Sequence, residues 1–269
     1  MATLDAHSPE GLSAFADDLQ ATGSYAFTDA DVGKAFATSQ IARANALRRL
    51  KKSGRIVAPW RGFYVVVPTE YRNAGSPPPS WFVDDLMHFL DQPYYVGLLS
   101  AAALHGASHQ QPMIFQVVTD RPTRSGTAGR ARIEFHMSSF VAGTPTVQLQ
   151  TETGTMRVST PESTAFDLVR FSTACGGWSN VATVLFELAE RLEPKALCAL
   201  AGHRKTPEVQ RLGYLLDRAG QPRLADPLLQ TLGSRRYRPV GLAPDAPSAG
   251  IAAATPWRVV PNAEAEIDL

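Results

Sequence analysis

The first 70 residues show apolar positions at helical spacing, followed by an apolar run. Apolar side chains that recur every three or four positions predict helices over residues 9–22, 29–36 and 40–53. Gly54 provides a stop for the third helix. The β-branched segment 56–67 predicts a hairpin. Three helices followed by a hairpin are typical of a winged helix-turn-helix.

The composition changes between residues 71 and 80, where Asn73, Gly75 and three consecutive prolines occur. Proline lacks an amide hydrogen and stiffens an extended chain, so no helix is expected to cross this segment. We therefore predict a winged helix-turn-helix domain over residues 1–72, a linker over 73–80, and a second domain over 81–269 with an irregular tail from about residue 233.

The second domain is predicted to be α+β. Alternating apolar positions predict strands that form one mixed sheet, over residues 114–118, 132–136, 147–151 and 154–158. Helical spacing predicts helices over residues 81–90, 96–105, 160–169, 178–192, 194–201, 207–218 and 224–232. Strands and helices do not alternate strictly, which excludes a doubly wound sheet. The segment Gly126–Gly129 is expected to be a flexible turn.

Charge is distributed unevenly along the chain. Eight of the 26 basic residues lie between Val32 and Thr69, a stretch without Asp or Glu, which leaves 18 basic against 25 acidic residues elsewhere. A basic module joined to an acidic one is typical of a protein that binds a polyanion. A basic run such as 48–52 also fits a solvated helix face, and the order of the surrounding elements is what favours DNA.

The predicted third helix carries most of the candidate DNA contacts. With Leu47 facing the core and about 100° between successive residues, Asn45 and Arg49 fall on the far side, and we expect them to contact bases. Arg43 turns partly inward. Lys52 and the wing residue Arg61 are expected to hold the DNA backbone. The candidate DNA-binding residues are Ser39, Gln40, Arg43, Asn45, Arg48, Arg49, Lys52, Arg55 and Arg61.

The second domain offers few groups for catalysis or metal binding. It offers His105, His109, His136 and His203, and no two of these have the spacing of zinc ligands. Cys175 and Cys198 are expected to be buried thiols rather than a disulfide or a metal pair. We therefore expect no catalytic residue, no metal and no cofactor. No apolar run approaches the roughly 20 residues that span a bilayer, and no signal peptide is evident, so a cytoplasmic protein without membrane contact is predicted.

Two alternatives to a DNA-binding repressor remain open. The polar segment Asp120–Arg124 follows a predicted buried strand and fits either a solvated loop or the ligand loop of an enzyme that acts on a nucleotide or a toxin. The second alternative is a protein-interaction module in which the winged helix binds a partner helix instead of DNA.

Four segments of the sequence, taken together, are more specific for a protein family than any one of them alone. They are residues 47–56 of the basic helix, 61–65 of the wing, the small-residue segment Tyr94–Ala107, and the helix start Thr160–Leu168. Together they resemble the AbiEi family, the antitoxins and autoregulators of type IV toxin-antitoxin systems that act in abortive infection of phage-infected bacteria. The resemblance extends over roughly residues 25–235.

This resemblance implies a function for each predicted domain. The winged helix is expected to repress its own operon by binding double-stranded DNA at inverted repeats in its promoter. The second domain is expected to be the antitoxin to a nucleotidyltransferase-like toxin, without necessarily forming a stable complex with it. Only the recognition-helix and wing positions carry over residue by residue. No catalytic motif carries over, so the protein is not expected to be an enzyme.

Overall fold

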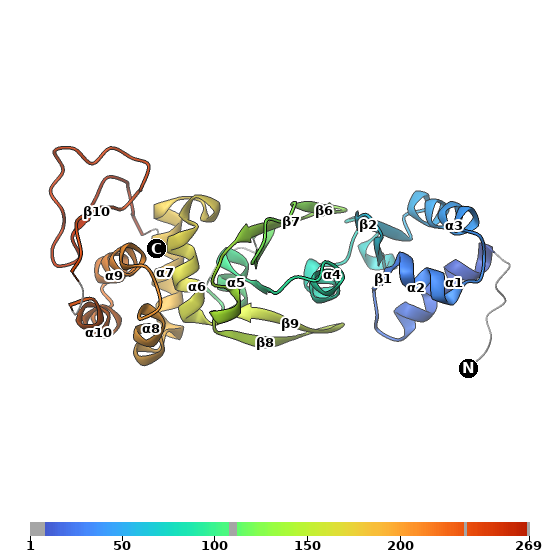
Figure 1. Ribbon diagram of the computed structural model, residues 1–269, viewed down its shortest axis with the longest axis horizontal. Helices are drawn as coiled ribbons and strands as arrows, with labels where there is room; N and C mark the ends of the chain where they lie inside the picture. Colours follow the sequence, from blue (N-terminus) through green and yellow to red (C-terminus); the bar gives the residue numbers. More distant parts are fainter. Residues whose placement is uncertain (1–8, 108–111, 234–235, 268–269) are drawn as a thin grey trace. The chain divides into compact units, whose positions relative to one another are not determined.

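The computed structural model describes residues 9–107, 112–233 and 236–267 (Figure 1). His109 lies outside these residues. The chain divides into two compact units. The first comprises residues 1–95, 113–142 and 148–157, and the second comprises residues 96–112, 143–147 and 158–269.

The N-terminal part of the first unit has the predicted order of helices and strands. It consists of α1 (Pro9–Ala21), β1 (Ala26–Thr28), α2 (Asp29–Ala35), α3 (Gln40–Lys52), β2 (Ile56–Trp60) and β3 (Phe63–Val66). The strands form an antiparallel sheet in the order β1-β3-β2. Figure 1 shows α1, α2 and α3 gathered beside this sheet, in blue. The predicted sequence of helices and hairpin is therefore confirmed.

Local signals define the ends of these helices. Thr28 and Asp31 form a capping box at the start of α2, in which each side chain accepts a hydrogen bond from the other residue's backbone amide. Gly54 follows α3 with a φ of +68°, a conformation that glycine adopts without strain. The apolar faces enclose one core, made by Leu12, Ala16, Phe27, Val32, Phe36, Leu47, Ile56, Tyr64 and Val66.

The segment predicted as a linker packs against the rest of the first unit. Ser76 is buried, and the carbonyl of Ala74 accepts a hydrogen bond of 2.8 Å from the amide of Arg130. Trp60 packs edge-on to Phe135, with ring centroids 5.8 Å apart. These contacts join the N-terminal helices and hairpin to the strands of residues 113–142, so both belong to the first unit.

The main sheet is mixed and contains six strands. They are β4 (Tyr94–Val96), β5 (Ile114–Thr119), β6 (Gly126–Ala128), β7 (Ala131–Met137), β8 (Thr146–Thr151) and β9 (Gly154–Ser159), in the order β6-β7-β5-β4-β9-β8. β7 is parallel to β5 and antiparallel to β6. All four predicted strands are confirmed. The flexible turn predicted at Gly126–Gly129 is wrong, because residues 126–128 pair with β7 as a strand.

The seven predicted helices of the second domain are confirmed. They are α4 (Val83–Phe89), α5 (Leu98–Leu104), α6 (Pro161–Arg170), α7 (Trp178–Leu188), α8 (Pro194–Ala201), α9 (Thr206–Arg218) and α10 (Pro222–Gly233). Proline stands in the first turn of α6, α8 and α9, where its missing amide hydrogen leaves no bond unmade. In the second unit α6 packs against α7, α8 and α9. The α+β class is therefore confirmed.

The remaining elements are short. Single 3-10 turns span Thr69–Tyr71, Pro79–Trp81, Val141–Gly143, Ser172–Cys175 and Ala189–Arg191. In the tail, β10 (Val240–Gly241) pairs in parallel with β11 (Val259–Val260). Trp257 anchors this tail, because its ring lies against Gly213 of α9 and is 1% exposed.

Candidate nucleic-acid interface

The start of α3 is fixed by side chains of its own first turn. Ser39 caps the helix, since its hydroxyl accepts a hydrogen bond of 3.3 Å from the amide of Ala42. The guanidinium of Arg43 donates from Nη1 to the carbonyls of Phe36, at 3.2 Å, and Thr38, at 3.0 Å. The predicted inward turn of Arg43 is confirmed. This arginine therefore holds the turn between α2 and α3.

The exposed face of α3 is rotated relative to the predicted one. Ala46 and Leu50 pack against the core beside Leu47, so the buried face extends to one side of Leu47. The exposed face is consequently centred about 100–140° from Leu47, where Ile41 and Arg48 lie. Asn45 is half-buried rather than fully outward. The exposed residues of α3 are Gln40, Ile41, Ala42, Ala44, Arg48, Arg49, Lys51 and Lys52.

Asn45 is coupled to Arg48 one turn further along the helix. Nη2 of Arg48 donates a hydrogen bond of 3.1 Å to Oδ1 of Asn45. The bond restrains the guanidinium, which loses less conformational entropy when it binds a ligand from this position. Asn45 thus orients the central cation of the exposed face.

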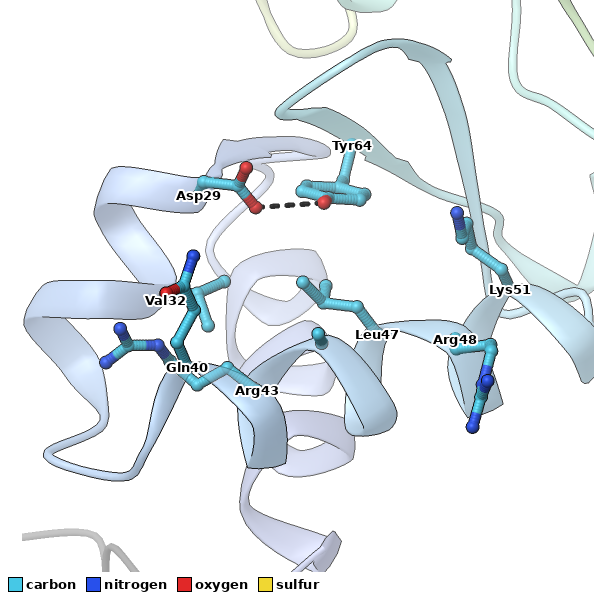
Figure 2. Close-up of a pocket in the computed structure, with 9 residues that line it drawn as sticks. Asp29, Val32, Gln40, Arg43, Leu47, Arg48, Lys51 and Tyr64 are labelled. Atoms are coloured by element: carbon cyan, nitrogen blue, oxygen red, sulfur yellow. Dashed lines mark hydrogen bonds between the residues drawn. The ribbon is translucent and has the colours of Figure 1, made fainter.

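A groove of about 430 Å³ runs along one side of α3 (Figure 2). It is lined by Asp29, Val32, Gln40, Arg43, Ala44, Leu47, Arg48, Lys51 and Tyr64. Figure 2 shows Asp29 and Tyr64 across the groove from α3. The Tyr64 hydroxyl donates a hydrogen bond of 2.9 Å to Oδ1 of Asp29. Cations therefore lie on the α3 side of the groove and the carboxylate lies on the opposite side.

Burial raises the pKa of Tyr64 to about 12, and the hydrogen bond to Asp29 and the negative charge of Asp29 act in the same direction. The folded pKa lies above the ordinary value of 10.0, so Tyr64 contributes stability that is complete below pH 10 and is lost as the pH rises toward 12. We expect the absorbance titration at 295 nm of wild type minus Tyr64→Phe to show a midpoint near pH 12. A difference curve centred near pH 10 contradicts this expectation.

The two remaining arginines of the predicted interface differ in their surroundings. Arg55 forms an ion pair with Asp17 of α1. Arg61 is exposed at the turn between β2 and β3. This turn is tight, and its Gly62 carbonyl accepts a hydrogen bond of 3.0 Å from the amide of Asp29. The hairpin turn is therefore short and rests against the start of α2.

The structure places the nine predicted residues in three groups. Ser39, Arg43 and Arg55 are engaged in bonds within the protein. Gln40, Arg48, Arg49 and Lys52 share the exposed face of α3 with the half-buried Asn45, and Arg61 lies on the hairpin. The prediction omitted Ile41 and Lys51, which share that face. On the helical wheel they lie about 120° and 40° from Leu47, on the side opposite to Ala46 and Leu50. These positions would have indicated that both residues are exposed.

Two sequence motifs that lie far apart in the chain meet in the second unit. α5 packs against α6. Nε2 of His105, at the end of α5, is 2.7 Å from the carbonyl oxygen of Ser159. The Ser159 hydroxyl is in turn 2.7 Å from that of Thr164, and Thr160 caps α6. The segments 94–107 and 160–168 thus form one packed junction, in which His105 acts as a structural residue.

Residues 95–218, which include this junction, match the family model of the AbiEi antitoxin C-terminal domain. The predicted resemblance to the AbiEi family is confirmed for this segment. The chain is also similar to the crystal structure of the RV2827C protein from Mycobacterium tuberculosis, with a TM-score of 0.68 and 18% sequence identity over 96% of this chain and 93% of that one. At this identity the likeness concerns the fold. No curated protein matches the chain.

The loop Asp120–Arg124 of the AbiEi domain is tied to the turn after α4. Arg121 donates to the carbonyl of Asp91, and the hydroxyl of Thr123 donates to Oε1 of Gln92 at 2.7 Å. A second cleft of the first unit, of about 330 Å³, includes Gln92 but no residue of this loop. The loop has the bonds of a surface turn.

Reactive groups are sparse in the described ranges. No three His, Cys, Asp or Glu side chains there lie close enough to hold a metal ion. Cys175 and Cys198 are free thiols, the first buried and the second half-buried. Burial raises the pKa of the Cys175 thiol, which keeps it in the unreactive protonated form. None of the helices between residues 9 and 267 that the structure describes is long and apolar enough to cross a bilayer.

Proposed function

We propose that this protein is a bacterial, cytoplasmic repressor that binds duplex DNA through α3 and autoregulates a toxin-antitoxin operon. The observation that carries the proposal is the exposed face of α3, on which Arg48, Arg49, Lys51 and Lys52 gather in a stretch free of acidic residues from 32 to 69. The match of residues 95–218 to an antitoxin family supports the proposal that this operon encodes a toxin and its antitoxin.

The chemistry of this face suits the major groove. Arginine forms paired hydrogen bonds with the O6 and N7 atoms of guanine, and lysine neutralises phosphates. The exposed alanines Ala42 and Ala44 allow the helix backbone to approach the bases closely. α3 is preceded by a fixed turn, so it is presented to DNA as a preorganised element, which reduces the entropy lost on binding.

The proposed partner of the AbiEi domain is a nucleotidyltransferase-like toxin, as in type IV systems of abortive infection. Support comes from the antitoxin family of residues 95–218. Co-expression with the product of the neighbouring gene tests this part separately. Restored growth in the presence of an otherwise toxic nucleotidyltransferase supports it, and unchanged toxicity contradicts it.

The DNA-binding part predicts a strong salt dependence. Of the eight cations between residues 32 and 69, Arg43 and Arg55 are engaged internally and six are exposed. With about five of them on phosphates, log K should fall against log salt concentration with a slope of about −4 to −5 for each bound copy.

A gel shift with the DNA upstream of the protein's own gene, over about 50 to 200 mM salt, measures this slope. Affinity is expected to fall roughly 250- to 1,000-fold across that range. Absence of a shift at the lowest salt with micromolar protein contradicts the proposal. A shift whose midpoint is independent of salt contradicts the role given to the cations.

A further inference from the structure

Ile41 is a large apolar side chain that α3 presents to solvent. It is 74% exposed, and no other large apolar side chain between residues 11 and 75 is exposed. The N-terminal part of the first unit otherwise places such side chains in its core or partly against it. A single exposed apolar residue is common on protein surfaces, so its meaning depends on its position.

That position is the N-terminal end of the exposed face of α3, whose exposed cations occupy the second half of the helix. Ile41 and Arg48 lie about 20° apart on the wheel of α3, separated by two turns of helix. Ile41 also belongs to the first turn, which Ser39 caps and Arg43 anchors. The side chain therefore points from a fixed backbone toward the same side of α3 as Arg48.

We propose that Ile41 contacts the 5-methyl group of a thymine in the major groove and so determines part of the operator sequence. This inference rests on the proposed DNA-binding function. Thymine is the one base that presents a methyl group in that groove, and an aliphatic side chain placed against polar base edges would leave them unpaired. The cations further along the same face, and the absence of acidic residues from positions 32 to 69, specify nucleic acid as the occupant.

Ile41 and Arg48 contact different base pairs. Seven residues of α-helix span about 10 Å, and base pairs are stacked at intervals of about 3.4 Å. The thymine contacted by Ile41 and the base contacted by Arg48 are thus up to about three steps apart in one half-site. Their contributions can therefore be separated by changing single bases.

The test pairs a change in the protein with a change in the DNA. Synthetic duplexes of the footprinted upstream site carry deoxyuridine in place of thymine, one position at a time, which removes only the methyl group. In each half-site, deoxyuridine at one position is expected to weaken wild-type binding. The duplex with that substitution should bind about three- to tenfold more weakly than the duplex with thymine. Ile41→Ala is expected to bind the thymine duplex more weakly by a similar factor and to show no further loss with deoxyuridine.

The matched control is Ile251→Ala, which removes the same atoms from a side chain that is 42% exposed in the tail. It should retain the wild-type sensitivity to deoxyuridine. Equal sensitivity of Ile41→Ala and wild type to every deoxyuridine overturns the inference, as does a wild type indifferent to all of them. Both outcomes differ from failure of the proposed function, in which wild type binds no upstream DNA.

Discussion

Replacing Arg48 with Glu is expected to weaken binding to the upstream DNA by about 100-fold or more at 100 mM salt. Arg48 lies at the centre of the exposed face of α3, and its guanidinium is held by Asn45. The change removes a contact worth about 1–3 kcal/mol and places a negative charge against the DNA. Fluorescence anisotropy with a labelled upstream duplex measures the loss.

The control for this variant is Lys195→Glu, the same sign of charge reversal at an exposed residue of α8. Net charge changes equally in the two proteins, so a general electrostatic effect would appear in both. We expect Lys195→Glu to bind within about threefold of wild type. Equal losses in the two variants contradict a specific role for Arg48. Unchanged circular dichroism shows that each variant is folded.

Replacing Trp257 with Ala is expected to destabilise the second unit by about 3–5 kcal/mol. The ring is 1% exposed and lies so close to α9 that a Cβ on Gly213 would come within 2.0 Å of it. Its Nε1 donates to Asp217 at 3.3 Å, and its carbonyl accepts from Gln210 at 2.9 Å. The loss removes both the packing and the anchor of the tail.

Urea denaturation followed by far-ultraviolet circular dichroism measures this effect as a lowered midpoint of the transition. Ile251→Ala is again the control, because it shortens an exposed side chain in the same tail and should change the free energy of unfolding by less than about 0.5 kcal/mol. A Trp257→Ala protein with the wild-type midpoint indicates that the tail does not support the second unit.

The helices were predictable because their signals are local. Proline in the first turn, a capping residue and a terminal glycine lie within a few positions of the element that they define. The strand β6 was missed because its evidence is not local: Gly126–Ala128 become a strand by pairing with β7. β4 was not predicted for the same reason: its Val96 pairs with Val158, 62 residues further along the chain.

The helix α3 and its cations were predictable, and the orientation of its exposed face was less so. Taking Leu47 alone as the inward direction placed Asn45 and Arg49 at the centre. Packing of Ala46 and Leu50 shifts that centre to Ile41 and Arg48. The ion pair of Arg55 depends on Asp17 of α1, and no spacing in the sequence indicates it. Charge identifies a surface, and packing decides which part of it is available.

The contact between the hairpin and the main sheet has a thermodynamic consequence. Trp60 of β2 lies against Phe135 of β7, and a Cβ on Gly126 of β6 would come within 2.7 Å of its ring. β6 and β7 belong to residues 95–218, so part of the segment that matches the antitoxin family is packed against the hairpin proposed to bind DNA. Linkage is reciprocal. If a partner displaces β6 when it binds, it changes the affinity for DNA by some factor. Bound DNA must then change the affinity for that partner by the same factor.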